Sequence, residues 1–137
     1  MKIHESKITV RYSETDQMGI VHHSRYYPWF EVGRTEFFAS GGISYGEIER
    51  RGIMLPLVET HCRYILPAKY EDALTIKTYI KELSPVKIRF GYDVVRDADR
   101  ALLAKGETLL AFTTTDFKPV ILKKYNPDLW EYISSMQ

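Results

Sequence analysis

The sequence predicts an α+β fold in which one long helix covers a face of a curved antiparallel sheet of about five strands. Residues 24–40 carry apolar side chains at helical spacing. Most segments after residue 53 alternate between apolar and polar residues, as half-buried strands do. Short turns separate those segments, which favours antiparallel neighbours. Such a sheet buries one face, so the single apolar helix is expected to cover it.

A first strand and the long helix follow from signals near the start of the chain. Residues 7–12, KITVRY, alternate in polarity and predict the strand. The helix is expected to begin at residues 23–27, because Pro28 is tolerated only in a first turn. The glycine pair at 41–42 predicts its end, since glycine accepts the left-handed cap. Gly33 in mid-helix predicts that another element packs closely against that face.

Capping signals predict two shorter helices. Ser44 and Glu47 have the form of a capping box, which predicts a short helix or turn running to Gly52. Asn126 as N-cap and Pro127 at the first helical position predict a helix at the end of the sequence.

Alternating or apolar runs predict the other strands. Pro56 and Pro67 interrupt the first run, so they are expected at the edges or ends of strands. Gly106 lies inside the last long run and predicts a β-bulge. Residues 118–122, KPVIL, are expected to close the sheet. The remaining strands are predicted at residues 53–68, 73–83, 86–95 and 101–116.

Length and composition predict a single domain spanning residues 1–137. The formal net charge is +1, so no nucleic-acid partner is expected. No segment approaches the roughly 20 apolar residues of a membrane span, so no membrane association is expected. The first residues lack the apolar run of a signal peptide. With Cys62 as the only cysteine, no internal disulfide can form, and a cytoplasmic location is predicted.

The loop before the long helix carries the strongest candidate for chemistry, Asp16. The amides of residues 22–24, at the start of the helix, are expected to lack intrahelical partners and to carry the positive end of the dipole. They would stabilise a carbonyl oxygen that becomes an oxyanion. Gly19 allows a turn tight enough for Asp16 to approach the same place. This is the minimum arrangement for hydrolysing an activated ester, and a loop aspartate that merely closes an Asx turn has the same sequence signature.

Other polar candidates favour structural roles. His22 and His23 have only His4 and His61 as further histidines, without the spacing of metal ligands, so no metal site is expected. Cys62 is predicted to be a buried structural thiol, with the neighbouring histidine on the opposite face of its strand.

On the long helix, Glu31 and Arg34 are three residues apart and are predicted to pair with each other. The sequence has no glycine-rich phosphate loop, no G-x-S-x-G motif and no C-x-x-C motif. Nucleotide hydrolysis and α/β-hydrolase chemistry are therefore not supported, and no cofactor is expected.

Three segments carry a family resemblance. Residues 15–38 read TDQMGIVHHSRYYPWFEVGRTEFF, residues 67–76 read PAKYEDALTI, and residues 104–120 read AKGETLLAFTTTDFKPV. They resemble the hotdog-fold thioesterases, specifically the 4-hydroxybenzoyl-CoA thioesterase-like family of acyl-CoA thioesterases. The resemblance covers residues 5–122 approximately, and the first segment is its most specific part.

The resemblance implies a hotdog fold and hydrolysis of an acyl-CoA thioester to free acid and CoA. It implies Asp16 as general base or nucleophile, and His23 as the residue whose backbone amide polarises the thioester carbonyl. Gly19 aligns with the glycine of the active-site loop, and Tyr26 with a motif tyrosine of the pocket or its packing. It also implies homodimers or homotetramers with active sites at subunit interfaces, so the expected partners are an acyl-CoA substrate and further copies of the chain.

Two alternatives stay open on the residues alone. A non-catalytic module that binds acyl thioesters would share the pocket and the oligomer but would not turn over. An acyl-carrier-protein thioesterase would use the same chemistry on a protein-bound acyl group. The aromatic residues at the helix start are predicted to fill the core rather than to select a substrate.

Overall fold

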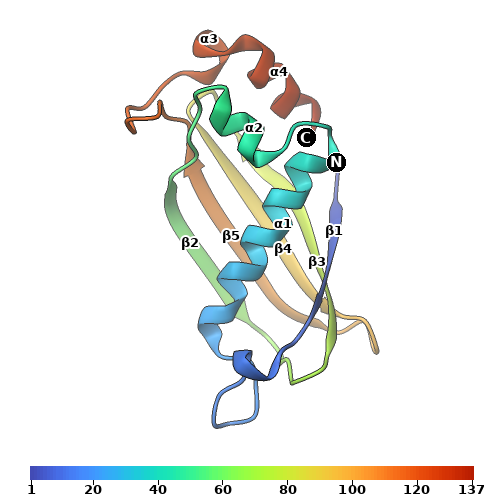
Figure 1. Ribbon diagram of the computed structural model, residues 1–137. Coiled ribbons are helices and arrows are strands. Elements are labelled where there is room, and N and C mark those ends of the chain that lie inside the picture. The colour runs from blue at the N-terminus through green and yellow to red at the C-terminus, as the bar shows by residue number, and fades with distance from the viewer.

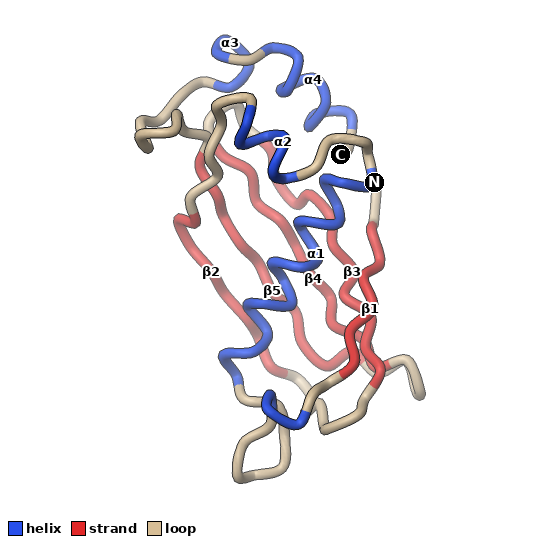
Figure 2. Tube along the Cα trace, viewed as in Figure 1, coloured by secondary structure: helices blue, strands red, loops and turns tan.

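A five-stranded sheet and one long helix dominate the fold (Figure 1). The structure, a computed structural model, describes residues 1–137. Figure 2 shows α1 lying across one face of the sheet, with α2, α3 and α4 gathered near the end of the sheet where α1 finishes. The strands are β1 (His4–Thr9), β2 (Leu57–Tyr64), β3 (Ala73–Leu83), β4 (Lys87–Arg96) and β5 (Leu102–Ala111). The α-helices are α1 (Tyr26–Ser40), α2 (Tyr45–Arg50), α3 (Leu122–Tyr125) and α4 (Pro127–Ser135), and two 3₁₀ turns, Tyr12–Glu14 and His23–Arg25, precede α1.

The strand order is β1-β3-β4-β5-β2, and every neighbouring pair is antiparallel. β1 and β2 are therefore the two edges of the sheet. The predicted α+β class, with a long helix against an antiparallel sheet of five strands, is confirmed. None of the helices combines the length and apolar character that crossing a bilayer requires.

Aromatic side chains hold α1 to the sheet. The fully buried Phe30 ring stacks on Tyr92 of β4, with ring centroids 4.4 Å apart. Phe37 and Phe38 each meet Phe90 edge to face, at 5.6 and 5.5 Å. Each fully buried side chain of this size contributes on the order of 1.5–3 kcal/mol. These contacts hold α1 on the sheet, and the candidate site lies at the N-terminal end of this helix.

Two glycines mark places where elements approach closely. A Cβ on Gly33 would collide with the Thr78 hydroxyl of β3, so the predicted close packing against mid-helix is confirmed. Gly106 sits in regular register between β2 and β4, so the predicted bulge there is wrong. The ring of Phe30 fills the space where a Gly106 side chain would be. Glycine at this position admits the helix rather than distorting the strand.

Residues 118–122 do not close the sheet, so that prediction is wrong. Pro119 makes only an isolated bridge to Thr113, and Leu122 already begins α3. Proline has no N–H to extend a ladder. A tight turn, in which the Phe117 amide donates to the Thr114 carbonyl oxygen at 3.0 Å, also redirects the chain after β5.

The boundaries of the other elements follow their local signals. The Ser44 hydroxyl accepts from the Glu47 amide at 3.1 Å, and Asn126 Oδ1 accepts from the Leu129 amide at 3.1 Å, so both predicted N-caps are confirmed. β1 runs from residue 4 to residue 9 rather than from 7 to 12. Tyr12, expected on the strand, instead opens a 3₁₀ turn and is exposed.

Candidate active site

The segment between β1 and α1 folds into a compact loop that turns at Gly19. Its φ of +80° is a left-handed conformation that glycine adopts without strain. The Gly19 amide donates to the Asp16 carbonyl oxygen, and the Asp16 amide donates to the Ile20 carbonyl oxygen, both at 2.9 Å. A bridge between Thr15 and Val21 closes the loop. These bonds fix Asp16 at the base of the turn.

The Asp16 carboxylate has one oxygen engaged and one free. Oδ1 accepts a hydrogen bond from the Met18 amide at 2.9 Å, which is the Asx turn that a purely structural role would require. Oδ2 accepts no hydrogen bond from the chain. Asp16 is half-buried and lines a cavity of about 320 Å³ whose other walls are mostly apolar. The Asx turn therefore orients the carboxylate and leaves one oxygen available for chemistry.

The entry to α1 carries an unpaired amide, on a residue that lines the same cavity. His22 caps the entry, with Nδ1 accepting from the Ser24 amide at 3.2 Å. The His23 amide donates to no atom of the chain, and His23 lines the cavity together with Asp16. The Tyr64 hydroxyl, at the end of β2, donates to the His23 carbonyl oxygen at 2.9 Å and holds this peptide against the sheet. A fixed, unpaired N–H is what a developing oxyanion requires.

Two tyrosines, Tyr26 and Tyr64, line the site, and the Cys62 thiol lies close to both. The rings of Tyr26 and Tyr64 meet edge to face with centroids 5.1 Å apart. Burial raises the pKa of Tyr26 to about 12, and the neighbouring Cys62 thiol adds to the rise. Burial also raises the pKa of Tyr64 and of the half-buried Cys62 thiol. All three groups are therefore protonated at neutral pH, and none of them competes with the carboxylate as a base.

A buried carboxylate, Glu14, ties the loop to α1. Its Oε2 accepts from Trp29 Nε1 at 2.9 Å, and its Oε1 accepts from the Arg11 amide at 2.8 Å. The Glu14 carbonyl oxygen also accepts from the His22 amide at 2.9 Å. Only 4% of Glu14 is exposed. This residue thus links the end of β1, the first turn of α1 and the helix entry, two residues away from Asp16.

The Glu14→Ala variant is expected to lower the free energy of unfolding by about 2–3 kcal/mol, because it leaves the buried Trp29 indole N–H without an acceptor. Chemical denaturation followed by circular dichroism measures the change. The control is Glu36→Ala, which removes an exposed carboxylate from α1 and is expected to change the same quantity by less than about 0.5 kcal/mol. Equal stability of the two variants would contradict the anchoring role.

The structure brings three of the predicted site residues, Asp16, His23 and Tyr26, to one cavity. Gly19 shapes the loop but does not line the cavity. Tyr64 was not among the candidates, because its hydroxyl contacts a residue 41 positions earlier in the chain and no local pattern indicates such a contact. The Glu14 carboxylate was missed for the same reason, since its indole partner lies 15 residues away.

The predicted pairing of Glu31 with Arg34 is wrong. No ion pair joins them, and the buried Arg34 Nε has no hydrogen-bond partner. Arg34 lies instead beside the phenols of Tyr92 and Tyr45. Packing of α1 on the sheet draws the guanidinium inward, while Glu31 stays exposed on the helix surface.

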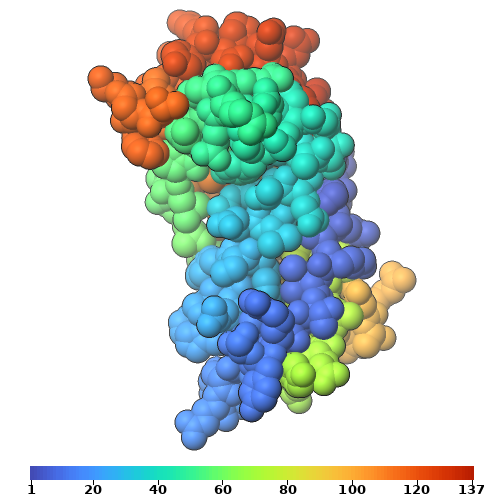
Figure 3. All heavy atoms as spheres, in the orientation of Figure 1, coloured from blue at the N-terminus to red at the C-terminus, as the bar shows by residue number.

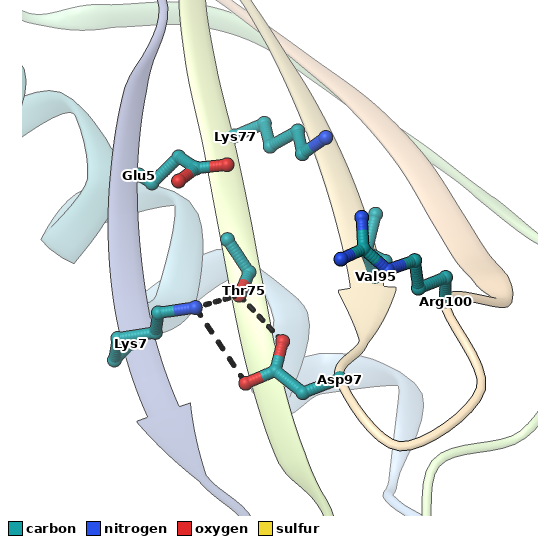
Figure 4. A pocket seen from close by; sticks show the side chains of 7 residues that line it. All are labelled: Glu5, Lys7, Thr75, Lys77, Val95, Asp97 and Arg100. Carbon is teal, nitrogen blue, oxygen red and sulfur yellow. Dashed lines mark hydrogen bonds and ion pairs between the residues drawn. The ribbon is translucent and has the colours of Figure 1, made fainter.

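A larger depression, of about 520 Å³, lies on the outer face of the sheet, opposite α1 (Figure 4). Three of its polar side chains pair with one another: Lys7 Nζ donates to the Thr75 hydroxyl, and this hydroxyl donates to Asp97, both at 2.6 Å. None of its lining residues lies on a helix, and only one of them, Val95, is hydrophobic. The smaller cavity at Asp16 is therefore the candidate active site. Nowhere do three or more His, Cys, Asp or Glu side chains gather in a metal-binding arrangement.

A long helix wrapped by an antiparallel sheet, with a carboxylate and an unpaired amide at the helix entry, is the arrangement that the resemblance to hotdog-fold thioesterases implies. A family model described as "Thioesterase-like superfamily" matches residues 10–122, and the chain belongs to this superfamily. The matched span includes the Asp16 loop, α1 and strands β2 to β5.

Individual relatives agree with this assignment. The chain is 33% identical to the putative acyl-CoA thioesterase YneP of Bacillus subtilis over 128 residues, 93% of each chain. It is 26% identical to the chloroplastic acyl-acyl carrier protein thioesterase ATL3 of Arabidopsis thaliana over 119 residues, 87% of this chain and 63% of that protein. A crystal structure of a DHNA-CoA thioesterase from Staphylococcus aureus superposes with a TM-score of 0.92 at 32% identity, covering 98% of this chain and 91% of that chain. The sequence resemblance to hotdog-fold thioesterases is confirmed, and the chain is a thioester hydrolase.

Proposed function

We propose that the protein hydrolyses an acyl-CoA thioester to the free acid and CoA, with residues 1–137 acting as one catalytic domain. The observation that carries this proposal is that Asp16, which has one carboxylate oxygen free, and His23, whose amide is unpaired, line one cavity. The mostly apolar walls of that cavity suit an acyl group. The acyl-CoA thioesterase and DHNA-CoA thioesterase among the relatives support CoA as the carrier of the acyl group.

In the proposed reaction, the acyl carbonyl oxygen accepts a hydrogen bond from the His23 amide, which stabilises the negative charge that develops on it. By one route, Asp16 removes a proton from water, the water oxygen bonds to the carbonyl carbon, and the carbon–sulfur bond breaks as the proton passes to the leaving thiolate. By the other route, an Asp16 oxygen bonds to the carbonyl carbon and CoA leaves as its thiolate. Water then hydrolyses the resulting anhydride, which regenerates the Asp16 carboxylate and releases the proton that the thiolate takes up.

We infer that two chains join through their β2 edges into one continuous sheet, either as a dimer or within a tetramer. β2 is an edge strand whose Leu57, Val58 and Tyr64 side chains are exposed, and the exposed Ile65 and Leu66 follow it. These apolar side chains lie at the two ends of an unpaired edge strand, and such an edge is normally covered or paired. The candidate cavity lies at the end of β2, so this pairing places each active site at the subunit boundary.

A carrier-protein thioesterase is the second candidate, because ATL3, at 26% identity, acts by name on acyl carrier protein. Thiol release from a panel of acyl-CoAs, compared with the same acyl groups on acyl carrier protein, tests both candidates. We expect the acyl-CoA substrates to be hydrolysed with a higher kcat/KM than the carrier-protein substrates. A higher kcat/KM for the carrier-protein substrates would select the second candidate. Tight acyl-CoA binding without thiol release would identify a binding module and contradict both.

A further inference from the structure

We propose that Phe117 of one protomer closes the active-site cavity of its partner and contacts the acyl group there. This inference rests on the proposed thioesterase activity and on the β2-paired dimer. It assigns a specificity-determining role to a turn far from Asp16 in the same chain.

Phe117 stands out because a well-ordered turn presents it to solvent. Its side chain is 66% exposed and belongs neither to the core nor to any aromatic pair. Its φ of +65° is a left-handed conformation that costs a non-glycine residue on the order of 1 kcal/mol. The Thr114 amide donates to the Lys118 carbonyl oxygen at 2.9 Å, and the Lys118 amide donates to the Thr114 hydroxyl at 3.2 Å, so the turn is held firmly. A rigid turn that presents an uncovered aromatic ring fits a contact with another surface.

The turn lies at the start of β2, at the edge of the molecule. Thr113, just before the turn, bridges to Met54, just before β2. Figures 1 and 3 show this segment, in orange, projecting outward beyond the start of β2. The active-site cavity lies at the other end of β2, where Tyr64 contributes to its wall. The eight residues of the strand span about 25 Å, so Phe117 is remote from the cavity of its own protomer.

Two-fold symmetry removes that separation. When two copies of a strand pair antiparallel, the start of each strand lies beside the end of the other. An axis near the middle of β2 places Leu57 of one protomer opposite Tyr64 of its partner. The turn at residues 114–118, which lies beyond the start of β2, then projects over the partner's cavity.

The Phe117 ring meets an apolar surface in this arrangement. Met18, Ile65 and Leu66 line the cavity and are all exposed in the single chain. The same axis that brings Phe117 to the cavity therefore covers these side chains. The acyl group is the apolar part of the substrate, whereas the CoA moiety carries amides and phosphates, so an aromatic ring at this wall contacts the acyl group.

The first test measures kcat/KM for thiol release from short and long acyl-CoAs with wild type and Phe117→Ala. We expect the ratio of the two kcat/KM values to change by about tenfold, while Phe117→Ala stays dimeric by analytical ultracentrifugation. The matched control is Arg100→Ala, which alters another exposed residue with positive φ, in the β4–β5 turn, and is expected to leave the ratio unchanged. An unchanged ratio in Phe117→Ala, or an equal loss for every acyl length, would overturn the proposal.

The second test asks whether Phe117 acts across the subunit boundary. Heterodimers of one Asp16→Asn chain and one Phe117→Ala chain, carrying different affinity tags, contain one site with an intact Asp16 that receives Phe117 from the other chain. We expect this site to show the wild-type acyl ratio. The ratio of the Phe117→Ala homodimer would instead mean that Phe117 acts within its own chain. Failure of the proposed function is distinguishable, because then wild type would release no thiol or the Asp16→Asn homodimer would remain active.

Discussion

The Asp16→Asn variant is expected to lower kcat for thiol release from acyl-CoA by roughly 10²- to 10⁴-fold, whereas KM changes little. The amide can neither accept the proton of water nor attack the carbonyl carbon. The fold is expected to survive, because the asparagine carbonyl oxygen can still accept the hydrogen bond from the Met18 amide that closes the Asx turn. Steady-state kinetics and thermal unfolding on the same preparation separate the two effects.

Asp99→Asn is the matched control for this substitution. Asp99 Oδ1 accepts from the Ala101 amide, two residues ahead, in the same arrangement that Asp16 makes with Met18. The control removes an equal charge from an equivalent turn that does not line the candidate cavity, so its kcat is expected to match wild type. If both variants kept wild-type turnover, Asp16 would have only the structural role of closing its turn.

Single-turnover hydrolysis in ¹⁸O-labelled water distinguishes the two roles of Asp16. A general base activates water, so the first product molecule carries label from the solvent. A nucleophile forms an anhydride, and hydrolysis at the Asp16 carbon would transfer an unlabelled enzyme oxygen to the product.

The Leu57→Glu variant is expected to raise the dissociation constant of the proposed β2-paired dimer by about 10²-fold or more, because each protomer would lose apolar burial and gain a charge at the paired edge. Thiol-release activity is expected to fall with the dimer and to recover as protein concentration rises. Analytical ultracentrifugation and kinetics across a concentration series measure both quantities.

Ile3→Glu controls for the added charge. Ile3 and Leu57 are equally exposed, at 51%, but Ile3 precedes β1 at the opposite edge of the sheet. Its dissociation constant is expected to stay at the wild-type value. A Leu57→Glu protein that remains dimeric and active at low concentration would place the subunit boundary elsewhere and would also remove the basis for the role of Phe117.

Several features of this protein followed from the sequence because they depend on neighbours a few residues apart. Pro28 and the glycine pair at 41–42 bracket α1 correctly, and the caps at Ser44 and Asn126 form as predicted. Alternation of polarity predicted β3 and β4 almost to the residue, since each has one face on the core. The family motif around Asp16 predicted the thioesterase class for the same reason, being one continuous stretch.

Other features were decided only by the tertiary structure. The Glu14 carboxylate is buried because Trp29 of α1 comes to rest above it, and the Tyr64 hydroxyl reaches the His23 peptide from the far edge of the sheet. Gly106 leaves room for the ring of a helix residue rather than forming a bulge.

The difference lies in the range of the interactions. Caps, turns and the periodicity of helices and strands depend on residues within about four positions of one another, so they can be predicted from the sequence. The hydrogen bonds from Trp29 to Glu14 and from Tyr64 to His23 join residues that are close only after α1 has packed on the sheet. Whether these bonds form therefore depends on how the side chains pack. The sequence by itself determined α1, the capped helices, most of the strands, the class of protein and the candidate carboxylate. Packing determined the contacts that hold the Asp16 loop against the start of α1.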